Sequence, residues 1–216
     1  MPDADPTPQA DTPDANESAA TGASVRKRPK PGERRVQILQ ALATMLEQPG
    51  AERITTAALA ARLEVSEAAL YRHFASKAQM FEGLIDFIEQ SVFSLVNQIQ
   101  ERQAGEPVRQ AAAIATLLVQ FAERNPGMTR VMVGDALVFE NERLQQRMNQ
   151  FFDRIESTLK QCLRANAEGS ATPTVDAQVR ASLLTAFLVG RLQRFARSGF
   201  KRLPSEHLED SLARIL

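Results

Sequence analysis

The sequence predicts an all-α fold built from a series of helices. Beyond about residue 32, apolar residues recur at spacings of three and four, which is the period of an amphipathic helix. In the same region no four-residue alternation of apolar and polar residues indicates a strand. Five prolines, which a helix interior does not tolerate, fall between the periodic stretches: Pro49, Pro107, Pro126, Pro173 and Pro204. The expected helices cover about residues 33–48, 56–63, 67–74, 76–101, 107–124, 128–139, 142–167, 175–198 and 205–215.

The second and third expected helices are short, and polar residues mark where they begin. Thr55 or Thr56 can cap the second helix and Ser66 the third, because these side chains accept hydrogen bonds from the free amides of a first turn. A turn of three residues, Glu64-Val65-Ser66, joins the two helices, so residues 54–77 predict a helix-turn-helix. The first helix covers this pair with an apolar face at Val36, Leu39, Ala43 and Leu46.

Several of the helices expected beyond residue 76 are long. Ser76 can cap a helix through Glu101, ~40 Å long at 1.5 Å per residue. Pro107 can open the next helix, since the first helical position tolerates proline. The helix at about 175–198 is apolar on more than one face, and such a helix must be buried on several sides.

Composition and charge exclude several classes of protein. Lys and Arg total 26, as do Asp and Glu, so the formal net charge is zero. The single cysteine, Cys162, excludes a disulfide framework and fits a reducing cytoplasm, and the two distant histidines cannot assemble a zinc site. No apolar run approaches the ~18 residues of a membrane span, and the acidic N-terminus is unlike a signal peptide. We therefore expect a cytoplasmic protein with no metal and no membrane span.

We also expect no enzymatic activity and no cofactor. The sequence has no Gly-rich phosphate loop, no GxSxG elbow and no paired carboxylates with a base among them. His73 belongs to the helix-turn-helix and His207 to the last expected helix, so neither has a catalytic setting.

Charge is distributed unevenly along the chain. Residues 1–24 contain five acids and no base, whereas residues 25–35 contain six bases and one acid. Residues 1–31 also hold six of the eleven prolines and almost no large apolar side chain, so we expect a disordered tail. Two interpretations of this tail are open: an inert solubilising segment, or an arm whose basic end contacts phosphate through Arg26, Lys27, Arg28 and Lys30. We expect a helix-turn-helix domain over residues 32–76 and a helical domain over residues 77–216.

The helix-turn-helix carries the residues that we expect to contact DNA. Tyr71, His73 and Lys77 are donors suited to phosphate oxygens, and Arg72 suits a phosphate or a guanine edge. Short side chains on the outer face of the second helix of the pair admit a base edge. The expected contacts in this segment are Thr55, Ser66, Glu67, Ala68, Ala69, Tyr71, Arg72, His73 and Lys77.

The same segment resembles the DNA-binding domain of TetR-type regulators. The resemblance extends to the long helix from Ser76 and to the all-α remainder, so it covers about residues 33–216. It implies a homodimer that binds a palindromic DNA duplex. The matching residues are Thr55-Thr56, Leu59-Ala60, Val65-Ser66, Leu70-Tyr71-Arg72-His73-Phe74 and Ser76-Lys77.

Further segments are similar to one branch of that family, the nucleoid occlusion factors. This similarity implies a nucleoid-associated dimer that binds the tubulin-like division protein FtsZ, disrupts its polymers and blocks assembly of the division ring over the chromosome. The similar segments are residues 66–77, 80–81, 84–89, 123–127, 136–140, 143–145 and 147–150.

In that branch the FtsZ-binding surface lies on the fourth and fifth helices. Two nearby positions depart from the expected pattern, because Leu95 stands in place of a basic residue and Gln120 in place of glycine. Each candidate also has a purely structural interpretation, as core for the apolar residues or as a helix end before Pro126 for the polar ones. The positions that match the branch are Phe87, Leu117, Arg124 and Asn125.

The helices at about 142–167 and 175–198 are expected to form a four-helix dimer interface with the same helices of a second subunit. An intramolecular core alone is the alternative. The expected interface residues are Phe151, Phe152, Ile155, Leu184, Phe187, Leu188, Gly190 and Phe195.

The alternative function is a TetR-type transcriptional repressor that a small molecule releases from its operator. That function requires a pocket in the helical domain. The absence of tryptophan and the single tyrosine weigh against a pocket for large aromatic ligands, although Phe and Met can line one. A closed helical core would favour a protein partner, and a roomy cavity studded with polar groups would favour a repressor.

Overall fold

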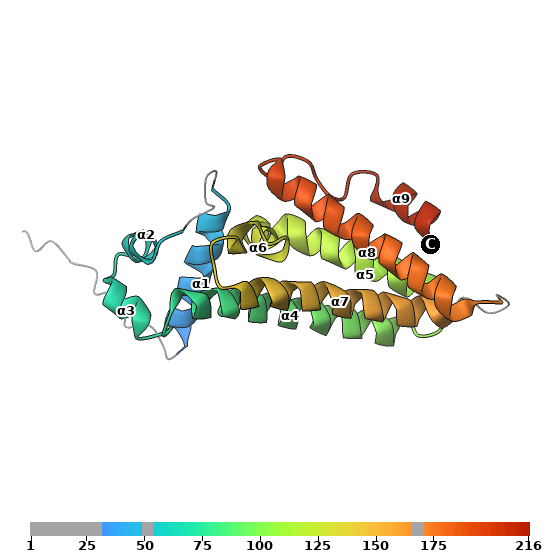
Figure 1. Cartoon of the computed structure of the whole chain (residues 1–216), viewed down its shortest axis with the longest axis horizontal. Helices are drawn as coiled ribbons and strands as arrows, with labels where there is room; N and C mark the ends of the chain where they lie inside the picture. Colours follow the sequence, from blue (N-terminus) through green and yellow to red (C-terminus); the bar gives the residue numbers. More distant parts are fainter. Residues whose placement is uncertain (1–31, 49–53, 166–170) are drawn as a thin grey trace, which may run out of the picture.

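The computed structural model describes residues 32–48, 54–165 and 171–216, and the regular structure in these ranges is entirely helical. The expected all-α class is therefore confirmed. The basic run at Arg26, Lys27, Arg28 and Lys30 lies outside the described residues. Figure 1 shows the helices of residues 33–71 at one end of an elongated molecule and the other helices along the rest of its length.

The N-terminal unit consists of α1 (Glu33–Leu46), α2 (Thr56–Arg62) and α3 (Glu67–Tyr71). These helices pack because each turns its large apolar side chains inward. The buried side chains are Ile38, Leu42 and Leu46 of α1, Leu59 of α2, Leu70 of α3 and Phe74 just beyond it.

The rest of the chain forms a helical bundle. It consists of α4 (Lys77–Arg102), α5 (Pro107–Arg124), α6 (Pro126–Met132), the short 3-10 helix η1 (Asp135–Leu137), α7 (Glu142–Ala165), α8 (Pro173–Arg197) and α9 (Leu208–Ile215). The central helix α5 packs against α4, α7 and α8, and α7 also packs along α8. In Figure 1, α4 and α7 run side by side along the long axis, with α8 and α9 on the opposite edge. None of the described helices is long and apolar enough to cross a bilayer.

Three expected helices have bounds that differ by three residues or more from those in the structure. The helix expected over 128–139 ends at Met132, because Gly134 has a left-handed backbone (φ 83°) that an α-helix cannot continue through. The last helix begins at Leu208 rather than at residue 205, because His207 is also left-handed (φ 52°). The third expected helix, the second of the helix-turn-helix, ends at Tyr71, three residues earlier than expected. Residues 66–74 are called the recognition segment below.

One hydrophobic core runs through the N-terminal unit and the bundle. The expected domain boundary near residue 76 coincides with the start of α4, whose buried Phe81 and Leu84 belong to the same core cluster as Phe74. The helix α6 also packs directly on α1. The recognition segment is therefore held on a rigid support that reaches into the bundle.

Candidate nucleic-acid interface and partner surface

Side-chain caps fix the two helices of the candidate nucleic-acid interface. The Thr55 hydroxyl accepts a hydrogen bond from the Ala58 amide at 3.1 Å, and the Ser66 hydroxyl accepts one from the Ala69 amide at 3.2 Å. Ser76 caps α4 in the same way. The expected caps are thus confirmed, with Thr55 rather than Thr56 in the capping position. Because these hydroxyls are local partners of the first turns, the start of each helix is fixed by its own sequence.

Thr56 and Glu67 join the two helices of the pair. The Thr56 hydroxyl donates to the Glu67 carboxylate with 2.6 Å between the oxygens. Glu67 was expected to face a DNA groove, and the structure gives its carboxylate a partner on α2 instead. This bond links the first turns of α2 and α3.

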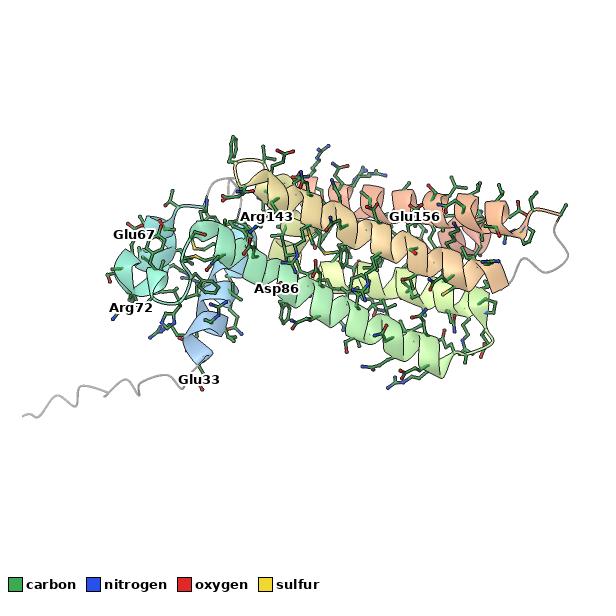
Figure 2. The ribbon with its side chains drawn as sticks, turned by 60° about the horizontal axis from the view of Figure 1, so that its bottom comes forward. Glu33, Glu67, Arg72, Asp86, Arg143 and Glu156 are labelled. Carbon is green, nitrogen blue, oxygen red and sulfur yellow. The ribbon has the colours of Figure 1, made fainter. Side chains whose placement is uncertain are left out.

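The outer face of α3 and the residues just after it present other expected DNA contacts to solvent. Tyr71 is 46% exposed, and Ala68, Arg72 and His73 are also exposed, while Ala69 is half-buried. Figure 2 shows Glu67 and Arg72 at the end of the molecule that lies away from the bundle. A short capped helix that ends in a phenol and is followed by a guanidinium and an imidazole presents hydrogen-bond donors that suit the phosphates of a DNA duplex.

Arg35 supports this segment from α1, a role that the sequence did not reveal. Its guanidinium lies over the Phe74 ring, 4.1 Å from the centroid, and donates to the backbone carbonyl of His73. Both contacts hold the end of the recognition segment against α1. From the sequence, Arg35 could be assigned only to the basic run of residues 25–35. Its contact with a residue 38 positions away leaves no local signal.

Lys77 was expected to be free to bind a DNA phosphate, but in the structure it has a partner within the protein. Its ammonium is paired with the carboxylate of Glu140, in the turn that leads into α7, and lies 5.7 Å from the centroid of the Phe81 ring. In this structure the first residue of α4 is therefore bound to the bundle.

The residues expected to contact a protein partner lie on α4 and α5, which pack together. Phe87 is 48% exposed, so it is not a core side chain, and Leu95 lies exposed two turns further along α4. On α5, Leu117 is half-buried and Arg124 is exposed at the last helical residue. The Asn125 side-chain amide donates to the Phe121 carbonyl at 2.8 Å, so it ends α5 as the structural interpretation expected.

Ion pairs fix α4 against α7. Arg143 pairs with Glu82, and Arg147 bonds Asp86 and Glu89 at 2.6 Å each. The hydrogen bond with Glu89 is the main cause of a raised pKa for Arg147. Asp86 and Arg143 are labelled in Figure 2 on the two helices concerned. These contacts hold the backbone that carries Phe87, and no local sequence signal reveals them because each links residues about sixty apart.

Burial within one chain already accounts for five residues of the expected dimer interface. Phe151, Ile155, Leu184 and Leu188 are buried in the core that this chain forms by itself, and Phe195 is buried beside Phe200. Phe152 and Phe187 are half-buried. A Cβ added at Gly190 would meet no atom within 4 Å, so this glycine makes no close helix crossing inside the chain.

The solvent side of α8 carries large apolar side chains that are not among the expected dimer-interface residues. Val175, Val179 and Leu183 repeat every four residues, and each is more than half exposed. The stripe continues into a hollow of about 780 Å³, lined on α8 by Ala186, Phe187, Gly190, Arg191 and Arg194. A run of this length on one helix face is typical of a surface that a protein partner covers.

Within the described residues, no group of three His, Cys, Asp or Glu side chains could hold a metal ion. Cys162 is buried, and burial raises the pKa of its thiol, so it is a core side chain rather than a reactive thiolate.

Two family profiles match the chain. The profile of bacterial regulatory proteins of the tetR family matches residues 38–84, and the SlmA-like profile described as a tetracyclin repressor-like C-terminal domain matches residues 107–215. The first covers the capped helix pair, and the second covers α5 to α9.

Curated relatives match most of the chain. The nucleoid occlusion factor SlmA of Idiomarina loihiensis is 54% identical over 175 residues, covering 81% of this chain and 89% of the relative. The proteins of the same name from Aliivibrio fischeri and Vibrio cholerae are 53% and 52% identical, over 84% and 82% of this chain and 93% and 91% of the relatives.

Solved structures share the fold at lower identity. The TetR family regulator PfmR from Thermus thermophilus matches with a TM-score of 0.66 and 20% identity, over 84% of this chain and 95% of that one. FadR from Bacillus subtilis, in complex with stearoyl-CoA, matches with a TM-score of 0.64 and 14% identity, over 83% and 96%.

Proposed function

Because the chain belongs to the TetR family and, within it, to the nucleoid occlusion factors called SlmA, we propose that it is a dimeric DNA-binding protein that prevents cell division over the nucleoid. In this function the dimer binds palindromic chromosomal sites and FtsZ at the same time, disrupts FtsZ polymers and blocks the division ring. The observation that carries the proposal is the identity of 51–54% to such factors, which runs through the bundle as well as the DNA-binding unit.

Binding of DNA is assigned to the outer face of α3. Its N-terminal turn would enter the major groove, with Arg72 near base edges and Tyr71 and His73 near phosphates. The support for this assignment is the exposure of these side chains on a helix fixed by the Ser66 cap, the Thr56–Glu67 bond and Arg35. The basic residues 26–30 would add phosphate contacts beside the start of α1.

Dimerisation is assigned to the exposed stripe of α8. A two-fold axis through this face would bring two copies of Val179, Leu183 and Phe187 together, with the open side of Gly190 available for close approach. The same axis would relate the two copies of α3, so that they read two half-sites about one helical turn apart.

Binding of FtsZ is assigned to Phe87, Leu117 and Arg124. Aromatic residues and arginine are enriched at protein interfaces, and Phe87 and Arg124 are both exposed on helices that pack together. An acidic and apolar segment of the partner would satisfy both groups. Asn125 would act by ending α5 behind Arg124, since its amide is already bonded to Phe121.

The repressor alternative requires space for a small molecule inside the bundle. Most of the buried side chains of α4, α5, α7 and α8 are apolar, with Val92, Ile114, Leu118, Ile155 and Leu188 at most 1% exposed, and the polar Thr185 of α8 is buried as well. This packing favours a protein partner over an internal ligand, because a ligand would have to displace core contacts.

Mapping the chromosomal binding sites in living cells tests the proposal. Many sites scattered within coding regions, and sparse near the replication terminus, are expected of a nucleoid occlusion factor. Binding confined to a few promoters would instead identify a transcriptional repressor.

A further inference from the structure

The contact between Lys77 and Glu140 joins the DNA-binding end of the molecule to the bundle. The two residues are 63 positions apart, and the pair is partly shielded, with the Lys77 side chain 26% exposed and that of Glu140 11% exposed. Lys77 is the first residue of α4, immediately after the Ser76 cap and the recognition segment. Glu140 lies between η1 and α7, where its amide donates to the Leu137 carbonyl at 3.0 Å.

An ammonium held by a shielded carboxylate is not free to neutralise a phosphate. If Lys77 reaches for DNA, it must leave Glu140, and the carboxylate then loses its partner in a poorly hydrated position next to a polyanion. Both consequences oppose DNA binding. We propose that Glu140 is a positioning residue that competes with DNA for Lys77 and thereby lowers the affinity of the protein for its sites; this inference rests on the proposed DNA-binding function.

Competition of this kind is reciprocal. The free energy by which the Glu140 contact weakens DNA binding equals the free energy by which DNA binding weakens that contact, so DNA binding and the anchoring of the turn at residues 138–141 are coupled. Next to Glu140 in the turn, Val138 and Phe139 are both about two-thirds exposed, so Glu140 provides the turn's anchor to α4. DNA binding is therefore expected to loosen the turn, which amide hydrogen exchange at residues 138–141 reports.

The test is the substitution Glu140→Gln in the full-length protein, which removes the charge and keeps the shape. Glu142→Gln is the matched control, because Glu142 is an exposed acid in the first turn of α7 and the change in net charge is identical. Operator affinity is measured by fluorescence anisotropy. Glu140→Gln is expected to bind about two- to fivefold tighter per half-site, the range that a weak ion pair supplies, and roughly four- to 25-fold tighter as a dimer. Glu142→Gln should bind within about twofold of wild type.

Two further measurements separate competition from a structural role. In a Lys77→Gln background, Glu140→Gln should change the affinity by no more than the Glu142→Gln control does, because the competition for Lys77 is gone and only the general effect of removing a negative charge remains. The plot of log affinity against log salt should also be steeper in Glu140→Gln by up to about one per half-site, because the wild-type carboxylate takes up a cation when Lys77 leaves it. If the variant does not fold, Glu140→Asp, which keeps the charge but shortens the reach, replaces it and should also bind more tightly than wild type.

The outcomes are distinct. Tighter binding by Glu140→Gln that depends on Lys77 supports the inference. If Glu140→Gln binds the operator equally or more weakly than wild type while the control is unchanged, the inference is wrong and the Lys77–Glu140 pair is only a structural contact. If the wild-type protein binds no duplex at all, the proposed function fails, and the Glu140 inference fails with it.

Discussion

The backbone of Gly127 lies so close to Ala43 that a Cβ at residue 127 would be 2.0 Å from the Ala43 carbonyl oxygen. The start of α6 is thus pressed against α1, which supports the recognition segment. Arg124 and Asn125 stand immediately before α6. The candidate partner surface and the DNA-binding unit therefore meet at one tight backbone contact.

Gly127→Ala is expected to lower the free energy of unfolding by about 1–3 kcal/mol. The added methyl meets backbone, which cannot rotate away as a side chain can, so α1 and α6 must separate. Urea unfolding at matched protein concentrations measures the effect. A urea midpoint equal to that of wild type would show that α1 and α6 can move apart without loss of stability.

Arg72→Ala is expected to weaken operator binding by about 1–3 kcal/mol per half-site if its guanidinium reaches a base edge. Arg109→Ala is the matched control, because Arg109 is an exposed arginine at the start of α5, paired only locally with Glu106. Anisotropy titrations with an operator and with unrelated duplexes check the prediction. A loss of the same size on every duplex would assign Arg72 to phosphate rather than to a base, and no loss at all would remove α3 from the interface.

Tyr71→Ala is expected to weaken binding to all duplexes by a similar factor, because a phenol on phosphate fixes position without reading sequence. Tyr71→Phe should reproduce most of the loss if the hydroxyl makes the contact. The same titrations measure it. Full affinity in both variants would contradict the placement of this exposed side chain on DNA.

Truncation separates the two parts of the N-terminal tail. Deleting residues 1–24, which carry five acids and no base, should leave folding and DNA specificity intact. Deleting residues 1–31 should weaken DNA binding and reduce its salt dependence, since Arg26, Lys27, Arg28 and Lys30 are lost with their phosphate contacts. If both truncated proteins bind as the full chain does, the basic run has no part in binding.

Leu183→Glu is expected to convert the dimer to a monomer and to abolish tight operator binding. A charge in the middle of the α8 stripe would be buried without a partner in the dimer. Leu95→Glu is the control, because it makes the same change at an exposed leucine of α4. Sedimentation analysis over a range of concentrations should find the control dimeric, and a dimeric Leu183→Glu protein would move the interface elsewhere.

Local signals predicted much of the fold and of the candidate DNA interface. The caps at Thr55, Ser66 and Ser76 were found because a hydroxyl and the amides it bonds lie within three residues of each other. The helix ends at Gly134 and His207 were missed because apolar spacing continues past a residue whose backbone turns left-handed.

Contacts between distant residues could not be predicted in the same way. Helical periodicity shows that Phe151 and Leu184 are buried, but it cannot tell whether the covering surface belongs to the same chain or to a second one. For the same reason Lys77 was expected to be free, since nothing in its neighbourhood points to Glu140. The exposed positions Val175, Val179 and Leu183 became interface candidates only once the buried faces were known.

Binding of an FtsZ C-terminal peptide to the operator-bound protein tests the proposed function most directly. Labelled operator and labelled peptide can be titrated on one preparation by fluorescence anisotropy, with wild type, Arg124→Asp and, as a control on the same helix, Arg109→Asp. Wild type and Arg109→Asp are expected to bind the peptide. Arg124→Asp should lose most of that binding through charge reversal at the contact, while its operator affinity stays within about 1 kcal/mol, because Arg124 lies outside the DNA-binding unit. If the wild-type protein ignores both the peptide and whole FtsZ even when saturated with operator, the nucleoid occlusion function is contradicted.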